Sequence, residues 1–167
     1  MRIRDLLSLA AIQLNSPVVD KNESIEEGLR LMEHNGNLGD PAVYRLAVLE
    51  RETASTTGLG KGIAIPHAKS RAVIRPGLSA QVIPNGVDFA SLDGRPVYII
   101  FLIAVPDTRE DIHLDILARL SALLLEADFR ASLIAASSPE EFLRLVDNAD
   151  TARMAQKASR ITVPPRI

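Results

Sequence analysis

The sequence predicts one α/β (α+β) domain in which a mixed sheet is flanked by helices on both faces. Segments with helical periodicity alternate with short strand-like segments, the pattern of a sheet covered by helices. The run 97–105 is apolar throughout and rich in β-branched residues, which is typical of a central strand buried on both faces. A chain of 167 residues buries roughly 70% of its unfolded surface, enough for one substantial core.

The N-terminal part is expected to contain a short helix, a strand and a long helix. Residues 3–9 are assigned to one or two helical turns, and residues 12–14 to a short strand. Ser24 is a favourable N-cap, and acidic residues follow it in the first turn, where the helix dipole favours them. Apolar residues then recur at helical spacing until the breaker sequence at 35–37.

The middle of the chain is expected to form a second helix and two strands. An aspartate followed by proline at 40–41 is a cap with proline at the first helical position, and this helix should end near Glu52. Residues 63–65 and 78–83 are predicted strands, the second of which leads into a turn at 84–86.

The C-terminal third is predicted to be helical. Residues 112–124 have the apolar spacing of a long helix, and shorter helices are expected near 129–135 and 139–146. Apolar periodicity is then lost. We therefore expect a domain over residues 1–147 and a tail or linker over residues 148–167.

Composition narrows the classes of function. The chain has a net charge of −2 with both signs interspersed, so it lacks the basic stripe that nucleic-acid binding needs. It has no cysteine, which excludes disulfides and thiolate chemistry. Its longest apolar run is too short to span a bilayer, and Asp5 and Gln13 interrupt a faint resemblance to a signal peptide. We expect a soluble, cytoplasmic domain without membrane insertion.

The segment 51–69 contains the most informative motif of the chain. Gly58, Gly60 and Gly62 precede a short apolar strand, and Pro66 and His67 follow it. Proline lacks a backbone donor and restricts the preceding residue to extended geometry, so it ends a strand and sets the direction of the next residue. A histidine in that position, beside glycine-rich backbone, can face a ligand while rigid structure supports it. The motif predicts a reactive histidine.

Two further residues are candidates for the same site. His113 lies in the first turn of a helix that follows the buried strand, where α/β proteins place ligand sites, so it could share a crevice with His67. Arg51 ends a helix that leads into residues 55–58, where a fixed cation could meet an anion. The alternatives are a histidine that packs at a helix start and a solvated arginine. His34 is expected only to pair with helix-terminal carbonyls.

Other site motifs are absent by spacing. The glycines precede a strand and lack the dinucleotide-binding pattern, and no P-loop, Gly-x-Ser-x-Gly or His-Glu-x-x-His sequence occurs. Two histidines with Asp107 or Asp111 could hold a metal, but no third ligand stands at a standard spacing. We expect neither a metal nor a cofactor.

These motifs resemble the enzyme IIA domains of the bacterial phosphoenolpyruvate sugar phosphotransferase system, in the fructose/mannitol class. The likeness extends from about residue 3 to residue 146. The matching segments are 51–52, 55–60, 62–67, 86–89, 92–94 and 113–114.

The resemblance implies a phosphoryl relay. The phosphocarrier protein HPr would phosphorylate His67 on Nε2, and His67 would pass the group to a cognate IIB domain of a fructose-type permease during sugar uptake. His113 would donate a hydrogen bond to the phosphoryl oxygens, and Arg51 matches the family's active-site arginine. The residues expected to bind the phosphoryl group are Thr56, Thr57 and Gly58.

The family also has a regulatory branch. Nitrogen-type members act as binding proteins that are read by their phosphorylation state, and more often have glycine after the histidine and a single threonine. Here Thr56 and Thr57 are adjacent and Ala68 follows the histidine, which resembles the fructose type more. The nitrogen type is the alternative.

Overall fold

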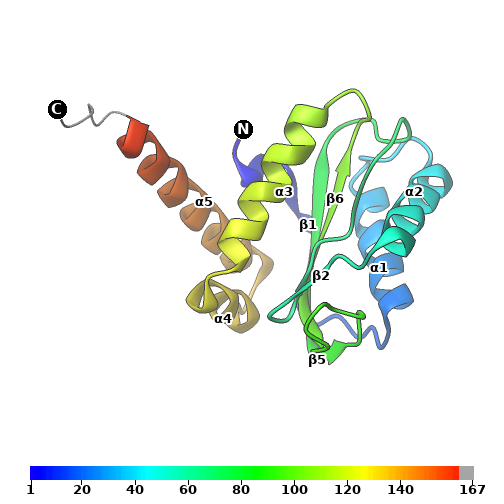
Figure 1. The fold of residues 1–167 in the computed structure, drawn as a ribbon, viewed down its shortest axis with the longest axis horizontal. Helices are drawn as coiled ribbons and strands as arrows, with labels where there is room; N and C mark the ends of the chain where they lie inside the picture. The colour runs from blue at the N-terminus through cyan, green and yellow to red at the C-terminus, as the bar shows by residue number, and fades with distance from the viewer. Residues whose placement is uncertain (162–167) are drawn as a thin grey trace.

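The computed structural model describes residues 1–161 and contains a six-stranded mixed sheet with helices on both faces (Figure 1). The strand order is β1-β5-β6-β3-β2, with β4 also paired to β6. The fold class predicted from the sequence is confirmed. In chain order the elements are η1 (Ile3–Asp5), β1 (Leu7–Gln13), α1 (Lys21–His34), α2 (Pro41–Ala54), β2 (Gly58–Gly60), β3 (Ile63–Ala64), β4 (His67–Lys69), β5 (Gly77–Val87), β6 (Val97–Val105), α3 (Glu110–Leu124), α4 (Ala127–Ala135) and α5 (Pro139–Ile161).

Strand β6 is the centre of the sheet, with the bounds predicted for it. It pairs in parallel with β3 and β4 and antiparallel with β5. Apart from Tyr98, its side chains are buried on both faces, which explains why its sequence is a continuous apolar run. Successive side chains therefore enter two different cores.

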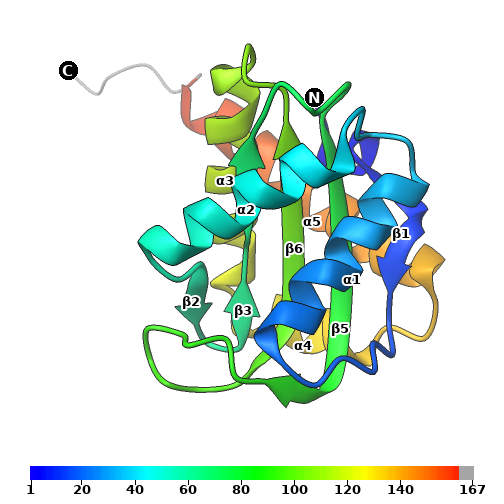
Figure 2. The same ribbon diagram turned by 90° about the vertical axis from the view of Figure 1, so that its right-hand side faces the viewer.

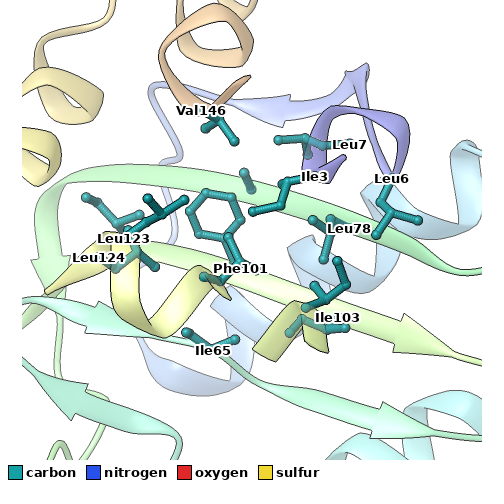
Figure 3. Packing of buried hydrophobic residues seen from close by; sticks show 14 of the residues in the cluster. Ile3, Leu6, Leu7, Ile65, Leu78, Phe101, Ile103, Leu123, Leu124 and Val146 are labelled. Carbon is teal, nitrogen blue, oxygen red and sulfur yellow. The ribbon is translucent and has the colours of Figure 1, made fainter. Parts of the chain in front are cut away.

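One core lies between the sheet and α3, α4 and α5. Phe101 of β6 stands in the middle of it, near Leu123, Leu124 and Val146 (Figure 3). Its ring centroid is 5.9 Å from that of Phe142, which α5 contributes. These aromatic and aliphatic contacts fix the helical layer that carries α3 along the sheet.

The other core lies between the sheet and α1 and α2, which cross the opposite face (Figure 2). Tyr44 of α2 is fully buried there, and its hydroxyl donates a 2.8 Å hydrogen bond to the carbonyl of Ile103. Burial raises the pKa of this phenol, so it remains a neutral donor. Helix α2 is thereby tied to β6 at one particular residue.

Helix starts were predicted with mixed success. Helix α2 begins at Pro41 with Asp40 as its cap, as expected, and ends at Ala54. Helix α1 begins earlier than predicted, because the carboxylate of Asp20 accepts a 2.8 Å bond from the Glu23 amide. Ser24 lies inside the helix and its hydroxyl donates to the Lys21 carbonyl. The assignment of Ser24 as N-cap was wrong.

Two strand assignments also need correction. The helical turn at the N-terminus is limited to η1, and β1 already begins at Leu7. Strand β5 continues through the turn predicted at 84–86, with a register shift between Val82 and Val87 and Gly86 at φ +70°. Pro84 lies beyond the part of β5 that pairs with β1, so its missing amide proton breaks no bond to that strand.

Helix α5 extends well past the helix end predicted at residue 146. It continues to Ile161, and its last turns project away from the sheet (Figure 1). Its buried contact beyond Val146 is polar: the carboxylate of Asp150 is fully buried, accepts the amide of Ile3 at 2.9 Å and binds Arg119 at 2.6 Å. The spacing of apolar residues therefore does not predict the part of α5 beyond Val146. The division into 1–147 and 148–167 stays a prediction, and residues 162–167 lie outside the described part.

Replacing Asp150 with alanine should lower the free energy of unfolding by about 3 kcal/mol, because the Arg119 guanidinium and the Ile3 amide lose a buried acceptor. Asp115→Ala is the matched control, since Asp115 is exposed and pairs with the same arginine at 3.0 Å. It should cost about 0.5 kcal/mol or less. Urea titration measures both values. Equal losses in the two variants would contradict a buried role for Asp150.

Candidate active site

Pro66 divides one extended segment into β3 and β4 without changing its register. Ile63 pairs with Ile99 of β6 and His67 pairs with Ile103, the same offset of 36 residues in both. The Pro66 carbonyl accepts a 3.0 Å bond from the Ile103 amide, so pairing continues across the proline. The sequence predicted His67 at a strand-to-loop junction. The structure places it at the first position of β4.

Strand alternation directs His67 toward α3. The side chains of Ile63 and Ile65 belong to the core beneath α3, α4 and α5, whereas Ala64 and Ala68 face the other core. Since the register is kept, His67 points to the same face as Ile63 and Ile65. The two isoleucines are covered by helices, and the histidine comes next in that row.

One hydrogen bond determines the tautomer of the His67 ring. Its Nδ1 lies 2.7 Å from the carbonyl oxygen of Ile65. A carbonyl can only accept, so Nδ1 carries the proton and donates it, and in the neutral ring Nε2 keeps its lone pair. The side chain is 9% exposed. His67 is therefore a buried, oriented imidazole with Nε2 as its free nucleophilic atom.

His113 lies beside this ring. It is in the first turn of α3, and its ring centroid is 5.2 Å from that of His67 at an interplanar angle of 49°. Both of its ring nitrogens are buried and have no hydrogen-bond partner within residues 1–161. Buried polar atoms normally have partners, so this pair of nitrogens indicates a ligand position. The two histidines therefore lie together, as the sequence led us to expect.

Arg51 contributes positive charge to the same place. It lies in the last turn of α2, and its Nη1 donates to the carbonyl of Ser55 at 3.0 Å and to the Ser55 hydroxyl at 3.4 Å. These bonds hold the guanidinium near the helix end. Its positive charge contributes to the lowered pKa of both His67 and His113.

Both imidazoles are biased toward the neutral form. Burial is the largest cause of the lowered pKa of His67. The hydrogen bond to Ile65 and the charge of Glu52 oppose this shift, and the charge of Arg51 adds to it. Burial also lowers the pKa of His113 most, followed by the charges of His67 and Lys69. At neutral pH the Nε2 lone pair of His67 is therefore available to an electrophile.

A tight turn in the glycine segment joins β2 to β3. Gly60 and Gly62 have φ values of +94° and +79°, which side chains rarely adopt, and they fold β2 back onto β3. At Gly58 an added Cβ would lie 2.4 Å from the hydroxyl of Ser91. The glycines thus permit a close turn and a close approach of the backbone to Ser91.

The two threonines are engaged within the protein. Thr56 donates a 3.0 Å bond to the Phe89 carbonyl, and Thr57 donates a 2.7 Å bond to the carboxylate of Glu52. Their assignment, with Gly58, as phosphoryl-binding residues stays a prediction. The residue that sequence reasoning missed is Glu52. It follows Tyr44 and Val48 at i+4 spacing on the buried stripe of α2, and that spacing could have revealed a buried acid.

Lys69 and Glu110 form a second pair that the sequence did not suggest. Lys69 follows His67 on the same face of β4, and Glu110 precedes His113 on α3. Their side chains form an ion pair at the exposed rim. Exposed pairs contribute little to stability, so the main consequence is positional: it joins β4 to α3 where the two histidines meet.

His67 keeps a lone pair on Nε2, and the neighbouring His113 ring has no hydrogen-bond partner within residues 1–161. Together with the positive charge of Arg51, these two rings form a candidate site for an anionic group. The chain matches the family model described as "Phosphoenolpyruvate-dependent sugar phosphotransferase system, EIIA 2" over residues 5–149, and it belongs to that family. The resemblance drawn from the motifs is confirmed. As a IIA component, the protein is a phosphoryl-transfer protein of this system.

Curated relatives include fructose-specific components. The chain is 38% identical over 150 residues to the PTS system fructose-specific EIIABC component of Bacillus subtilis, covering 90% of this chain and 24% of that protein. It therefore spans about a quarter of that relative's length. It is also 38% identical over 138 residues to the fructose-specific EIIA component of Haloferax volcanii, covering 83% of this chain and 90% of the relative.

Solved structures with this fold come from both branches of the family. The nitrogen regulatory protein IIA-Ntr from Neisseria meningitidis has a TM-score of 0.81 at 32% identity, over 86% of this chain and 98% of that one. The mannitol IIA enzyme of Escherichia coli, in its complex with phosphorylated mannitol IIB, has a TM-score of 0.73 at 25% identity, over 84% and 98% of the two chains.

Stability should fall as the pH is lowered from about 7.5 to about 5.5, in the range where histidines titrate. Burial lowers the pKa of both site histidines below the ordinary value of about 6.5, so the unfolded chain binds protons first and gains stability relative to the folded one. Urea titrations at several pH values would measure the slope. The double variant His67→Gln/His113→Gln should have a shallower slope in this window. His34→Gln, at an exposed position, is the control, and equal slopes in all three proteins would contradict the assignment.

Proposed function

We propose that His67 accepts a phosphoryl group from the phosphocarrier protein HPr and passes it to a fructose-type IIB domain during sugar uptake. The observation that carries this proposal is the 2.7 Å bond from His67 Nδ1 to the Ile65 carbonyl, which leaves Nε2 free beside His113. A relay residue needs a nucleophile that is ready at neutral pH and a product that remains reactive. A held imidazole meets both needs.

The proposed transfer to His67 is an in-line displacement at phosphorus. The lone pair of His67 Nε2 forms a bond to phosphorus while the bond from phosphorus to the carrier breaks, and its electron pair stays with the carrier. The Nδ1 proton stays on the ring, where the Ile65 carbonyl stabilises the positive charge that develops. Transfer to the IIB domain is the same displacement with Nε2 as the leaving group.

Charge neutralisation would come from the side chains around the ring. Phosphoryl transfer spreads charge over the equatorial oxygens, so most of the catalysis is positioning and electrostatics. An unpartnered nitrogen of His113 can donate to one such oxygen, and Arg51 supplies a fixed cation. His113 also lies in the first turn of α3, where the helix dipole favours an anion. This set needs no metal.

Fructose is the favoured substrate class of the cognate permease. The support is the 38% identity to the fructose-specific components of Bacillus subtilis and Haloferax volcanii, together with the adjacent Thr56 and Thr57 and with Ala68 after the histidine. Specificity for the sugar itself would reside in the membrane component of the permease.

The alternative is a nitrogen-type regulatory protein that binds partners according to its phosphorylation state. One observation favours it: the fold agrees with nitrogen regulatory IIA-Ntr at a TM-score of 0.81. Both branches would share the phosphorylated histidine. They would differ in whether the group moves on rapidly to a IIB domain.

The surface near His67 suits brief contact with two partners in succession. Leu114 of α3, which directly follows His113, is 56% exposed, and Leu59 of β2 is 42% exposed. Ile65 and Ala68, the close neighbours of His67 in sequence, are buried and belong to the cores. Isolated exposed leucines favour weak, reversible docking over tight binding.

The protein is expected to act in the cytoplasm, where HPr and the IIB domain would be found. Among residues 1–161, no helix has both the length and the apolar character that crossing a membrane would require. A cytoplasmic location and membrane recruitment through the cognate permease follow from the proposal.

Incubation with phosphoenolpyruvate, enzyme I and HPr should add one phosphoryl group that is labile in acid and stable in base, measured by intact mass. His67→Ala should abolish the adduct. His113→Ala should keep the adduct but slow its formation by about a hundredfold or more, as for loss of one preorganised donor. His34→Ala is the exposed control and should match the wild type. Full labelling of the His67 variant would show that another residue is the acceptor.

The phosphorylated protein should transfer its group rapidly to a purified fructose-type IIB domain from the same organism, followed by the loss of the adduct in single-turnover quench experiments. A fructose-type relay predicts that IIB empties the phosphohistidine far faster than spontaneous hydrolysis does. Retention of the group, together with capture of a non-transport partner by only one phosphorylation state, would favour the nitrogen-type alternative.

A further inference from the structure

A buried carboxylate lies at the end of α2, next to the site. Glu52 is 7% exposed, and its burial would be costly without full hydrogen bonding. Its Oε1 accepts the Thr57 amide at 2.8 Å and lies 3.1 Å from the Lys21 ammonium, and its Oε2 accepts the Thr57 hydroxyl at 2.7 Å. Both carboxylate oxygens therefore bind Thr57. The side chain clamps one residue of the glycine segment.

The clamped residue is linked to the His67 ring through the backbone. The Thr57 carbonyl accepts the Ile65 amide at 3.1 Å, and the Ile65 carbonyl accepts Nδ1 of His67 at 2.7 Å. Thr57 and Ile65, the two residues between Glu52 and His67, each form one of these bonds through the amide and one through the carbonyl. A displacement of Thr57 would therefore tilt Ile65 and move the oxygen that defines the tautomer.

The reactive tautomer depends on that oxygen. A neutral imidazole can carry its proton on either nitrogen, and the acceptor that faces one nitrogen decides between them. If the Ile65 carbonyl turned away from Nδ1, the proton could sit on Nε2 and remove the nucleophilic lone pair of His67. Groups that hold such an acceptor in place commonly affect activity strongly without touching the reacting atoms.

The positive charge of Lys21 offsets the negative charge of Glu52, which lies near a site proposed to bind an anion. Its ammonium pairs with Glu52 and lies 4.6 Å from the centroid of the Phe89 ring. The pair is formally neutral, so Glu52 can hold Thr57 with little net repulsion of an arriving phosphoryl group. The Glu52 carboxylate thus serves as the acceptor of two hydrogen bonds from Thr57.

We propose that Glu52 is a positioning residue for His67, which it holds in the Nδ1-protonated tautomer through Thr57 and Ile65. The inference rests on the proposed function in so far as His67 is the phosphoryl acceptor. The hydrogen-bonded chain itself exists in the unphosphorylated protein, so the tautomer can be measured without any transfer reaction.

The test combines nitrogen-15 NMR of the imidazoles with the rate of phosphorylation by phospho-HPr. Wild type should show only the Nδ1–H form of His67. Glu52→Ala should show a mixture with the Nε2–H form, and its phosphorylation should be slower by about ten- to a hundredfold. Glu52→Gln should restore the single tautomer, because its amide oxygen can accept from the Thr57 amide while its NH₂ donates to the Thr57 hydroxyl.

Glu50→Ala is the matched control, since Glu50 is exposed on the same helix, and it should behave as the wild type. If folded Glu52→Ala keeps the single Nδ1–H form, the proposal is wrong, whatever its rate. If Glu52→Ala does not fold, Thr57→Val decides: it removes one of the two contacts with Glu52 and should give a partial tautomer mixture, while an unchanged spectrum would overturn the proposal. Failure of wild type to accept any phosphoryl group would contradict the proposed function alone, because the spectra still test the positioning.

Discussion

The register that β3 and β4 share along β6 is the constraint on which the site depends. Pro66 interrupts the strand but leaves the 36-residue offset intact, so the odd-numbered side chains stay on the α3 face. Ile65 remains in the core, and its carbonyl is aimed at the next side chain in that row, His67. A slip of one residue would turn His67 to the α1 and α2 face and separate it from His113. The apolar strand β6, buried on both faces, makes such a slip costly.

The candidate site has a small net charge in the unphosphorylated protein. Burial lowers the pKa of both imidazoles, and Glu52 is paired with Lys21, which leaves the Arg51 guanidinium as a fixed cation beside two neutral rings. In the proposed reaction, the arriving phosphoryl group would bring negative charge to this environment, and the His113 ring nitrogens, which have no partner within residues 1–161, would be available to it. An environment that is complete only when the group is present favours transfer in both directions, as a relay requires.

The central part of this organisation could be predicted from the sequence. The apolar run of β6, the Asp40 cap of α2 and the glycine–proline–histidine motif each have one dominant local cause, and the sequence analysis identified them. The rest depends on contacts between distant residues. Asp20 displaced Ser24 as the cap through one hydrogen bond, and α5 continues because Asp150 binds Arg119 and the amide of Ile3. Glu52 looked like an ordinary acid at a helix end, although its i+4 spacing from Tyr44 and Val48 places it on the buried stripe of α2.

The most direct test of the account is to determine which nitrogen carries phosphorus in the phosphorylated protein, from phosphorus–nitrogen and proton–nitrogen couplings in a nitrogen-15 sample. If the bond to Ile65 selects the reactive nitrogen, there should be one phosphohistidine, with phosphorus on Nε2 of His67. A proton should remain on Nδ1, bonded to the Ile65 carbonyl. Phosphorus on Nδ1 of His67, or on either nitrogen of His113, would contradict it, because the hydrogen bond to Ile65 would then not be what selects the reactive atom.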